Sequence, residues 1–279
     1  MVEQISFWGS FDIWRDAMLV SVMSAAALSY LGVWMVLGRV VWLPLALSQV
    51  SSIGLVLAFI AGDLLGMAGH EGHLFLPEIV SLVFTGLVSI YFARRAAGGD
   101  QSTVVAYLLS ASAVLIAGGF IRGDLHDIQS VLFGNAVLVE HAQVYHVGAA
   151  ILTVTILHVL FGRKMLFSIF DPDAAGASGV NVFRHNAILY LTFAVMISFS
   201  TRAIGALPVF AFCVLPPMFA LRLTKTMRAA FVVSVAAGMF SAAAGYYLSF
   251  VAGIPAGASM AAVAAMLLAM SYMRRDVIQ

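Results

Sequence analysis

Long apolar stretches separated by short polar breaks run along almost the whole chain. A helix needs about 20 mainly apolar residues to cross the roughly 30 Å hydrocarbon layer of a bilayer. We count nine such stretches, within a range of about eight to ten, at Ala17–Leu37, Val41–Gly62, Glu78–Phe92, Thr103–Ile121, Ala142–Phe161, Asn186–Thr201, Leu207–Leu223, Ala229–Val251 and Ala256–Tyr272. The pattern therefore predicts an all-α polytopic membrane protein, with residues 1–279 forming a single transmembrane domain.

Composition supports a membrane environment and excludes several other classes. Hydrophobic residues make up 62% of the chain and charged residues 10%, against roughly 45–50% and about 25% in soluble domains. Membrane lipid is therefore the expected surrounding. The 14 basic and 13 acidic residues nearly cancel, to a net charge of +1, so no nucleic-acid partner is expected. The first sixteen residues lack the features of a signal peptide, so the first apolar stretch is expected to remain a spanning helix.

The basic residues predict the orientation of the chain. Cytoplasmic loops of membrane proteins carry an excess of Lys and Arg. With the N-terminus outside and nine spans, only Arg15, Arg122 and Arg202 lie outside. The other eleven of the 14 basic residues lie in the cytoplasm, namely Arg39, Arg94, Arg95, Arg163, Lys164, Arg184, Arg222, Lys225, Arg228, Arg274 and Arg275. This uneven split favours the stated orientation over its inverse.

A polar segment at about 163–185 interrupts the apolar pattern on the predicted cytoplasmic side. Asp171 precedes Pro172, and an Asp before a first-turn proline is a typical helix start. The segment has two interpretations: a short helix that transmits the motion of an ATPase to the spans, or a helix resting on the lipid headgroups. For the first, the residues assigned to coupling are Asp171, Asp173, Ala174, Gly176 and Gly179.

Several runs of this sequence occur in the order known from one transporter family. The run FDPDAAGASGV from Phe170 resembles the cytoplasmic segment of the permeases of zinc, manganese and iron-chelate ABC importers. The run SVLFGNAVLV from Ser130 resembles that family's Leu-Phe-Gly-Asp stretch. The stretch that begins LGVWMVLGRV at Leu31 is similar to the first two spans of the family. The closing helices are matched by GALPVFAFCVLPPMFALRL from Gly205 and GYYLSFVAGIPAGASM from Gly245.

This resemblance implies a permease that carries a divalent transition metal ion (zinc, manganese or iron) or its chelate across the bacterial plasma (inner) membrane. It also implies a homodimer or heterodimer of permeases, separate ABC ATPase subunits and an extracytoplasmic solute-binding protein. The chain has no GxxxxGK[ST] phosphate loop, which agrees with ATP hydrolysis in a partner. We therefore expect no enzymatic activity in this subunit and no permanently bound cofactor, the metal being the cargo.

The second span departs from the family at the positions that would bind a metal. The family commonly has Asp and, four residues later, His, where this chain has Leu45 and Gln49. Asn135 replaces the Asp of the Leu-Phe-Gly-Asp stretch, and Pro44 replaces a Gly. Gln offers a metal only a neutral carbonyl oxygen. Three explanations remain open: a weakly held or chelated cargo, ligands elsewhere in the chain, or a different permease partner that supplies them.

Polar residues within the spans are the best candidates for a translocation path. Polar side chains inside a membrane usually face the bundle interior, although hydrogen bonding between helices explains them about as well. We assign to the path Ser48, Gln49, Ser52 and Asn135.

Two external clusters are candidate cation sites. His70, Glu71 and His73 could share a zinc or manganese ion, or could form an ordinary polar loop. A short re-entrant element at 128–137 is expected to border the path, among Asp124, His126, Asp127, Glu140, His141 and His146. The single cysteine, Cys213, excludes an intrachain disulfide and a thiolate zinc site.

Two other functional classes fit less well. A secondary transporter driven by an ion gradient normally uses buried ionisable residues as coupling sites, and the predicted spans contain almost none. An intramembrane enzyme would need paired carboxylates, HExxH or a nucleophile beside a base. No such arrangement lies within a predicted span.

Overall fold

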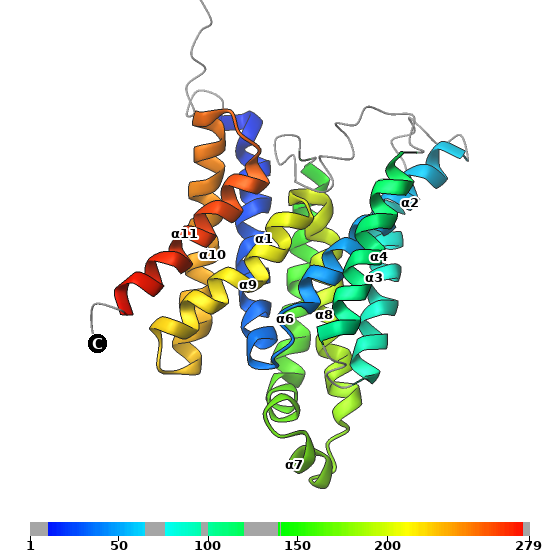
Figure 1. Ribbon diagram of the computed structural model, residues 1–279, viewed down its shortest axis with the longest axis vertical. Helices are drawn as coiled ribbons and strands as arrows, with labels where there is room; N and C mark the ends of the chain where they lie inside the picture. The colour runs from blue at the N-terminus through cyan, green and yellow to red at the C-terminus, as the bar shows by residue number, and fades with distance from the viewer. Residues whose placement is uncertain (1–10, 65–75, 96–99, 120–138, 140, 276–279) are drawn as a thin grey trace, which may run out of the picture.

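The computed structural model describes residues 11–64, 76–95, 100–119, 139 and 141–275, which are joined into one helical bundle (Figure 1). No strand occurs among these residues. The helices are α1 (Phe11–Leu37), α2 (Leu43–Leu64), α3 (Leu76–Arg94), α4 (Asp100–Gly118), α6 (His141–Phe170), α7 (Pro172–Ala177), α8 (Val182–Ile204), α9 (Ala206–Leu223), α10 (Met227–Ala252) and α11 (Ala256–Arg275). All except α7 are long and apolar enough to cross a membrane. Within the described residues, the predicted all-α fold with nine spans is confirmed.

The sixth and seventh spans are separate helices, although little polar sequence divides them. Gly205 alone connects α8 to α9, with a positive φ of 87° that favours glycine. Its N–H makes the last helical bond of α8, to the carbonyl of Thr201 at 2.9 Å, and its positive φ ends the helix. At the other end of α8, the side chain of Asn181 accepts a hydrogen bond from the N–H of Arg184. This cap starts α8 before the predicted limit at Asn186.

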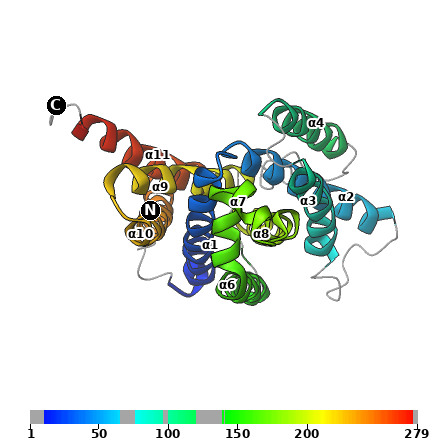
Figure 2. The same cartoon turned by 90° about the horizontal axis from the view of Figure 1, so that it is seen from below.

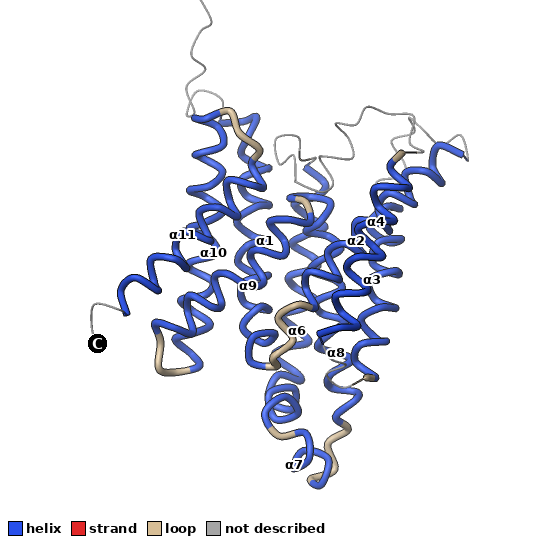
Figure 3. Tube along the Cα trace, in the orientation of Figure 1, coloured by secondary structure: helices blue, strands red, loops and turns tan. Residues whose placement is uncertain are grey.

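Successive spans alternate in direction, so the connections gather at two ends of the bundle (Figure 3). The lower end in Figure 1 holds α7 and the α1–α2 and α9–α10 connections. The upper end holds the α8–α9 and α10–α11 connections. Arg94 lies in the last turn of α3 and Arg222 in the last turn of α9, both at the α7 end. This arrangement agrees with the predicted side of the basic residues.

The helices form two groups on either side of a central pair. Seen from below, α1, α9, α10 and α11 lie on one side and α2, α3 and α4 on the other, with α6 and α8 between them (Figure 2). The central α8 packs against both α3 and α6. Its Phe193 and Ile197 are fully buried, as is Phe212 of α9. The peripheral α4 packs mainly on α2 and exposes large apolar side chains such as Leu109 and Ile116.

Several hydroxyl groups in the bundle find partners inside the protein, which is favourable because a bilayer core offers no water. Ser21 and Ser241 each donate to the carbonyl four residues earlier in their own helix. Other hydroxyls join helices: Ser234 of α10 donates to the carbonyl of Ser29 of α1 at 2.8 Å. Polar residues within a span therefore serve helix packing in several places, which bears directly on the candidate path.

Candidate functional site

The polar residues of α2 point in different directions. Ser48 and Ser52 are fully buried. The Ser48 hydroxyl donates to the carbonyl of Leu45 at 2.9 Å, and the Ser52 hydroxyl donates to the carbonyl of Ser48 at 3.0 Å. The Ser51 hydroxyl lies 2.8 Å from that of Ser81 in α3. In this conformation the three serines therefore stabilise α2 and its contact with α3.

Gln49 lies on another face of α2, where the described part of the chain leaves it partly exposed. Leu45 and Ile53, one turn away on either side, are also partly exposed. Lipid offers no partner for an amide within an apolar span, so such a side chain is favourable only beside water or another protein surface. Of the predicted path residues on α2, Gln49 alone has the exposure that contact with a cargo requires.

Several predicted sites lie outside the described residues. These are Asn135, the loop residues His70, Glu71 and His73, and the element at 128–137 with its neighbours Asp124, His126, Asp127 and Glu140. His141 and His146 are described and both belong to α6. Within the residues that the structure describes, no group of three His, Cys, Asp or Glu side chains could hold a metal ion.

The predicted cytoplasmic helix is present as α7, and local contacts define both of its ends. The Asp171 carboxylate accepts a hydrogen bond from the N–H of Ala174 at 2.9 Å, with Pro172 in the first turn. This confirms the predicted cap. At the other end, Gly179 has a positive φ of 79°, and its N–H donates to the carbonyl of Gly176 at 3.0 Å. Asp173 is exposed in the first turn.

The helix α7 forms a projecting tip (Figure 1). It is carried by α6, whose 30 residues span about 45 Å and exceed the bilayer core. Phe170 and Phe183 flank the tip and are 59% and 43% exposed. A Cβ atom at Gly176 would have no neighbouring atom within 4 Å. Both aromatic rings are therefore accessible at the end of the bundle that carries α7.

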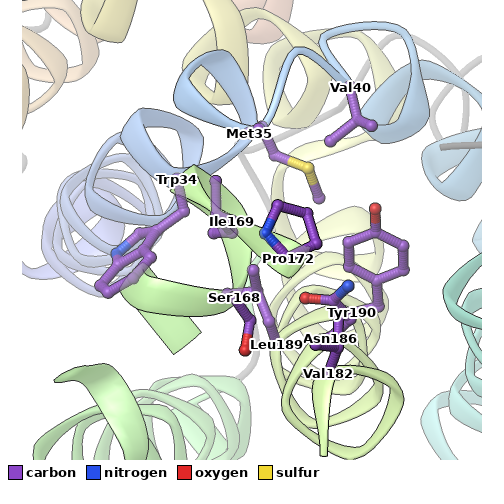
Figure 4. A pocket seen from close by; sticks show the side chains of 11 residues that line it. Trp34, Met35, Val40, Ser168, Ile169, Pro172, Val182, Asn186, Leu189 and Tyr190 are labelled. Atoms are coloured by element: carbon purple, nitrogen blue, oxygen red, sulfur yellow. The ribbon is translucent and has the colours of Figure 1, made fainter. Parts of the chain in front are cut away.

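A cavity of about 140 Å³ separates the beginning of α7 from the end of α1 (Figure 4). Trp34 and Met35 of α1 lie on one side of it, and Asn186 and Tyr190 of α8 lie on the other. Among the described helices, α7 packs against α6 and α8. A force on α7 therefore acts first on this central pair.

A buried ionic network lies near the end of the bundle opposite α7. Oε2 of Glu78 in α3 lies 2.5 Å from Nη1 of Arg202 in α8. Oε1 of Glu78 lies 3.5 Å from Nδ1 of His146 in α6. The exposed fractions of the three side chains are 2%, 16% and 8%. Glu78 was predicted to begin the third span and Arg202 to lie outside, but their pairing was not predicted.

His158 occupies a second polar position in the bundle. Its two ring nitrogens lie 3.2 Å from the Tyr30 hydroxyl and 3.1 Å from the Thr192 hydroxyl. The Trp34 ring packs edge-on at 5.0 Å. Since both nitrogens have partners in the protein, His158 joins α1, α6 and α8 and is not poised to bind a metal.

Comparisons with known proteins agree with this architecture. The chain is 25% identical over 266 residues to the manganese transport system membrane protein MntC of Halalkalibacterium halodurans, covering 94% of this chain and 87% of the relative. It is 23% identical over 270 residues to the high-affinity zinc uptake system membrane protein ZnuB of Haemophilus influenzae, covering 95% and 99%.

The fold is also known from solved structures. The structure of PsaBC from Streptococcus pneumoniae in complex with Fab matches with a TM-score of 0.79 and 20% identity, over 95% of this chain and 94% of the other. The ABC 3 transport family matches residues 10–275. Because this match covers nearly the whole sequence, the chain belongs to the ABC 3 transport family.

Proposed function

We propose that this chain is the membrane-spanning permease of an ATP-binding-cassette importer for a divalent transition metal ion (zinc, manganese or iron) or its chelate. Membership of the ABC 3 transport family and the names of the manganese and zinc relatives support this class of cargo. The single observation that carries the proposal is the capped helix α7 on the projecting tip between α6 and α8. It has the placement that an external motor needs to move the spans.

The proposed partners follow from what this chain offers and lacks. A separate ABC ATPase would cover α7 and the exposed Phe170 and Phe183. The sequence has no phosphate loop of its own. An extracytoplasmic solute-binding protein would deliver the cargo to the opposite end, in the bacterial plasma membrane. A second permease, identical or different, would face the partly exposed side of α2.

The proposed path passes Gln49, a partly exposed polar residue of α2. One amide per subunit holds a divalent ion less firmly than a carboxylate and an imidazole would. The cargo is then a weakly held ion or a chelate, or stronger ligands come from elsewhere in the chain or from a different partner permease.

Copurification and reconstitution test this function. The chain should copurify with an ABC ATPase encoded beside its gene, and liposomes containing the complex and its binding protein should take up radioactive manganese or zinc only with ATP. A secondary transporter would instead take up metal under an imposed ion gradient without ATP. That result would overturn the proposal.

A gain of ligands tests the path. Leu45 and Gln49 are four residues apart on one face of α2, so Leu45→Asp with Gln49→His would place a carboxylate beside an imidazole. We expect the concentration for half-maximal manganese uptake to fall by at least about tenfold, equivalent to about 1.4 kcal/mol. The matched control is Leu45→Asn, because Asn resembles Asp in shape and carries no charge. Its concentration for half-maximal manganese uptake should remain near that of the wild type. An unchanged concentration for half-maximal uptake in the double variant would show that the face of α2 with Leu45 and Gln49 does not line the path.

A further inference from the structure

The ionic network of Glu78, Arg202 and His146 lies at the opposite end of the bundle from the coupling helix, yet it involves the same two helices. The helices α6 and α8 are joined at one end by α7. Near the other end, His146 of α6 and Arg202 of α8 both contact the Glu78 carboxylate of α3. The network therefore connects α3 to the pair that carries α7.

Polar and aromatic contacts join α6 to α8 along their length. Near α7, the Phe161 ring of α6 lies 6.3 Å from the His185 ring of α8. Further along, the His158 ring donates to or accepts from the Thr192 hydroxyl at 3.1 Å. The pair is thus held together at the α7 end, in its middle and at Glu78, which favours movement as one body.

The helix α3 is fixed to α8 at both ends. At the end near α7, the Arg94 guanidinium lies 5.9 Å from the centre of the Phe183 ring. Phe183 belongs to the first turn of α8. At the opposite end, Arg202 and Glu78 form the ion pair. Between these points α3 packs along α8. The connections give α3 little freedom to slide against α8.

A buried ion pair is a costly way to hold two helices together. Moving two charges out of water consumes most of the energy that their attraction provides, so well-packed apolar residues would often stabilise the contact as well. The pair does specify position, because a carboxylate left without its partner is strongly unfavourable in an apolar setting. Its location is therefore better explained by the need for a fixed register than by stability.

We infer that Glu78 and Arg202 are positioning residues that make α3 move with α6 and α8, so that a push on α7 reaches the opposite mouth of the bundle. This inference rests on the proposed function of an ATP-driven importer. It assigns the ion pair a role in coupling ATP hydrolysis to transport and no contact with the cargo.

The test compares ATP hydrolysis with manganese uptake by the complete complex in liposomes. In Glu78→Gln the motor and α7 are intact, so ATP hydrolysis should stay within about twofold of the wild type, whereas manganese taken up per ATP should fall about tenfold. Arg202→Gln should likewise keep ATP hydrolysis near the wild type and lower the manganese taken up per ATP. Exchange of the charges in Glu78→Arg with Arg202→Glu should recover part of the uptake per ATP, because the pair forms again.

A matched control is available at the same end of the bundle. Asp16 of α1 pairs with His141 of α6 at 2.7 Å, but this contact is exposed. Asp16→Asn should therefore leave uptake per ATP unchanged, since an exposed pair contributes little. If the Gln variants of the network cannot be purified, Glu78→Asp retains the charge on a shorter side chain and should give an intermediate ratio.

The outcomes separate this inference from the proposed function. If the wild-type complex takes up no manganese or zinc with ATP, the proposed function fails. If the wild type is active and Glu78→Gln keeps the wild-type uptake per ATP, the inference is overturned while the function stands. A parallel loss of ATP hydrolysis and uptake, without recovery in the charge exchange, would reduce the network to a structural contact and overturn the inference as well.

Discussion

At the scale of single residues, Asp171 determines where the coupling helix begins. Its carboxylate is the side-chain acceptor at the start of a helix of only six residues. Such a short helix has little stability of its own, so each terminal contact matters. The contact also lies on the tip that we assign to the ATPase, which makes it open to a direct test.

Asp171→Ala should partially uncouple this permease from the proposed ATPase subunit. Loss of an N-cap costs about 1 kcal/mol, enough to lower the ratio of ordered to disordered helix about fivefold. We expect metal-stimulated ATP hydrolysis by the complex to fall by a similar factor. Asp171→Asn is the control, because Asn caps helices as well as Asp does. Equal losses in both variants would indicate that the charge, and not the cap, is what the partner recognises.

The sequence revealed this cap but not the Glu78–Arg202 pair, for a physical reason. A cap depends on neighbours within three residues, so Asp171 followed by Pro172 is informative by itself. The partners in the ion pair lie on different helices, and each flanks an apolar stretch where charged residues are ordinary. Gln49 is an intermediate case: its polarity in a span was visible, while its separation from Ser48 and Ser52 required the helix to be placed among its neighbours.

At the scale of helices, hydropathy predicted the number of spans but not all of their ends. The transfer of side chains into lipid decides which residues cross the membrane, whereas backbone hydrogen bonds decide where a helix stops. For α6 the end of the apolar stretch and the end of the helix differ, because the helix continues from Phe161 to Phe170 through the polar residues Arg163 and Lys164. The predicted polar segment at 163–185 therefore includes the ends of α6 and α8 in addition to α7.

Close packing between α2 and α3 gives a prediction at this scale. A Cβ at Gly54 would lie 2.6 Å from the Cα of Ser81, a backbone atom that cannot turn aside. Gly54→Ala should therefore separate the helices and weaken the Ser51–Ser81 hydrogen bond, at a cost of about 1–3 kcal/mol. The thermal unfolding temperature of the purified protein in detergent should fall by several degrees.

The same helix provides the control for this prediction. Nothing lies within 4 Å of a Cβ at Gly62, and Ala is favoured over Gly in a helix by about 1 kcal/mol. Gly62→Ala should therefore leave the unfolding temperature unchanged or raise it slightly. Equal unfolding temperatures for the Gly54 variant and the wild type would show that the α2–α3 contact is looser than described.

At the scale of the whole molecule, the two ends of the bundle should be accessible from opposite sides of the membrane. Cys213 is fully buried, so the natural protein should resist an impermeant maleimide, and Cys213→Ala provides a background without thiols. In this background, Ser178→Cys reports on the exposed α7 tip and Ile254→Cys on the exposed α10–α11 connection. The first should react only in inside-out vesicles and the second only in right-side-out vesicles. The reverse result would place α7 outside the cell, beyond the reach of any ATPase.

The single-residue joint at Gly205 limits how the molecule can open. With one residue between them, the upper ends of α8 and α9 cannot move apart by more than a few ångströms, since a residue spans at most about 3.6 Å. Any large movement of α8 relative to α9 is therefore a rotation about Gly205 and not a separation of these two ends. A wide opening at this end of the bundle has to form at another helix–helix interface. A cross-link that fixed the angle between α8 and α9 would therefore be expected to stop the proposed transport cycle without blocking the entrance.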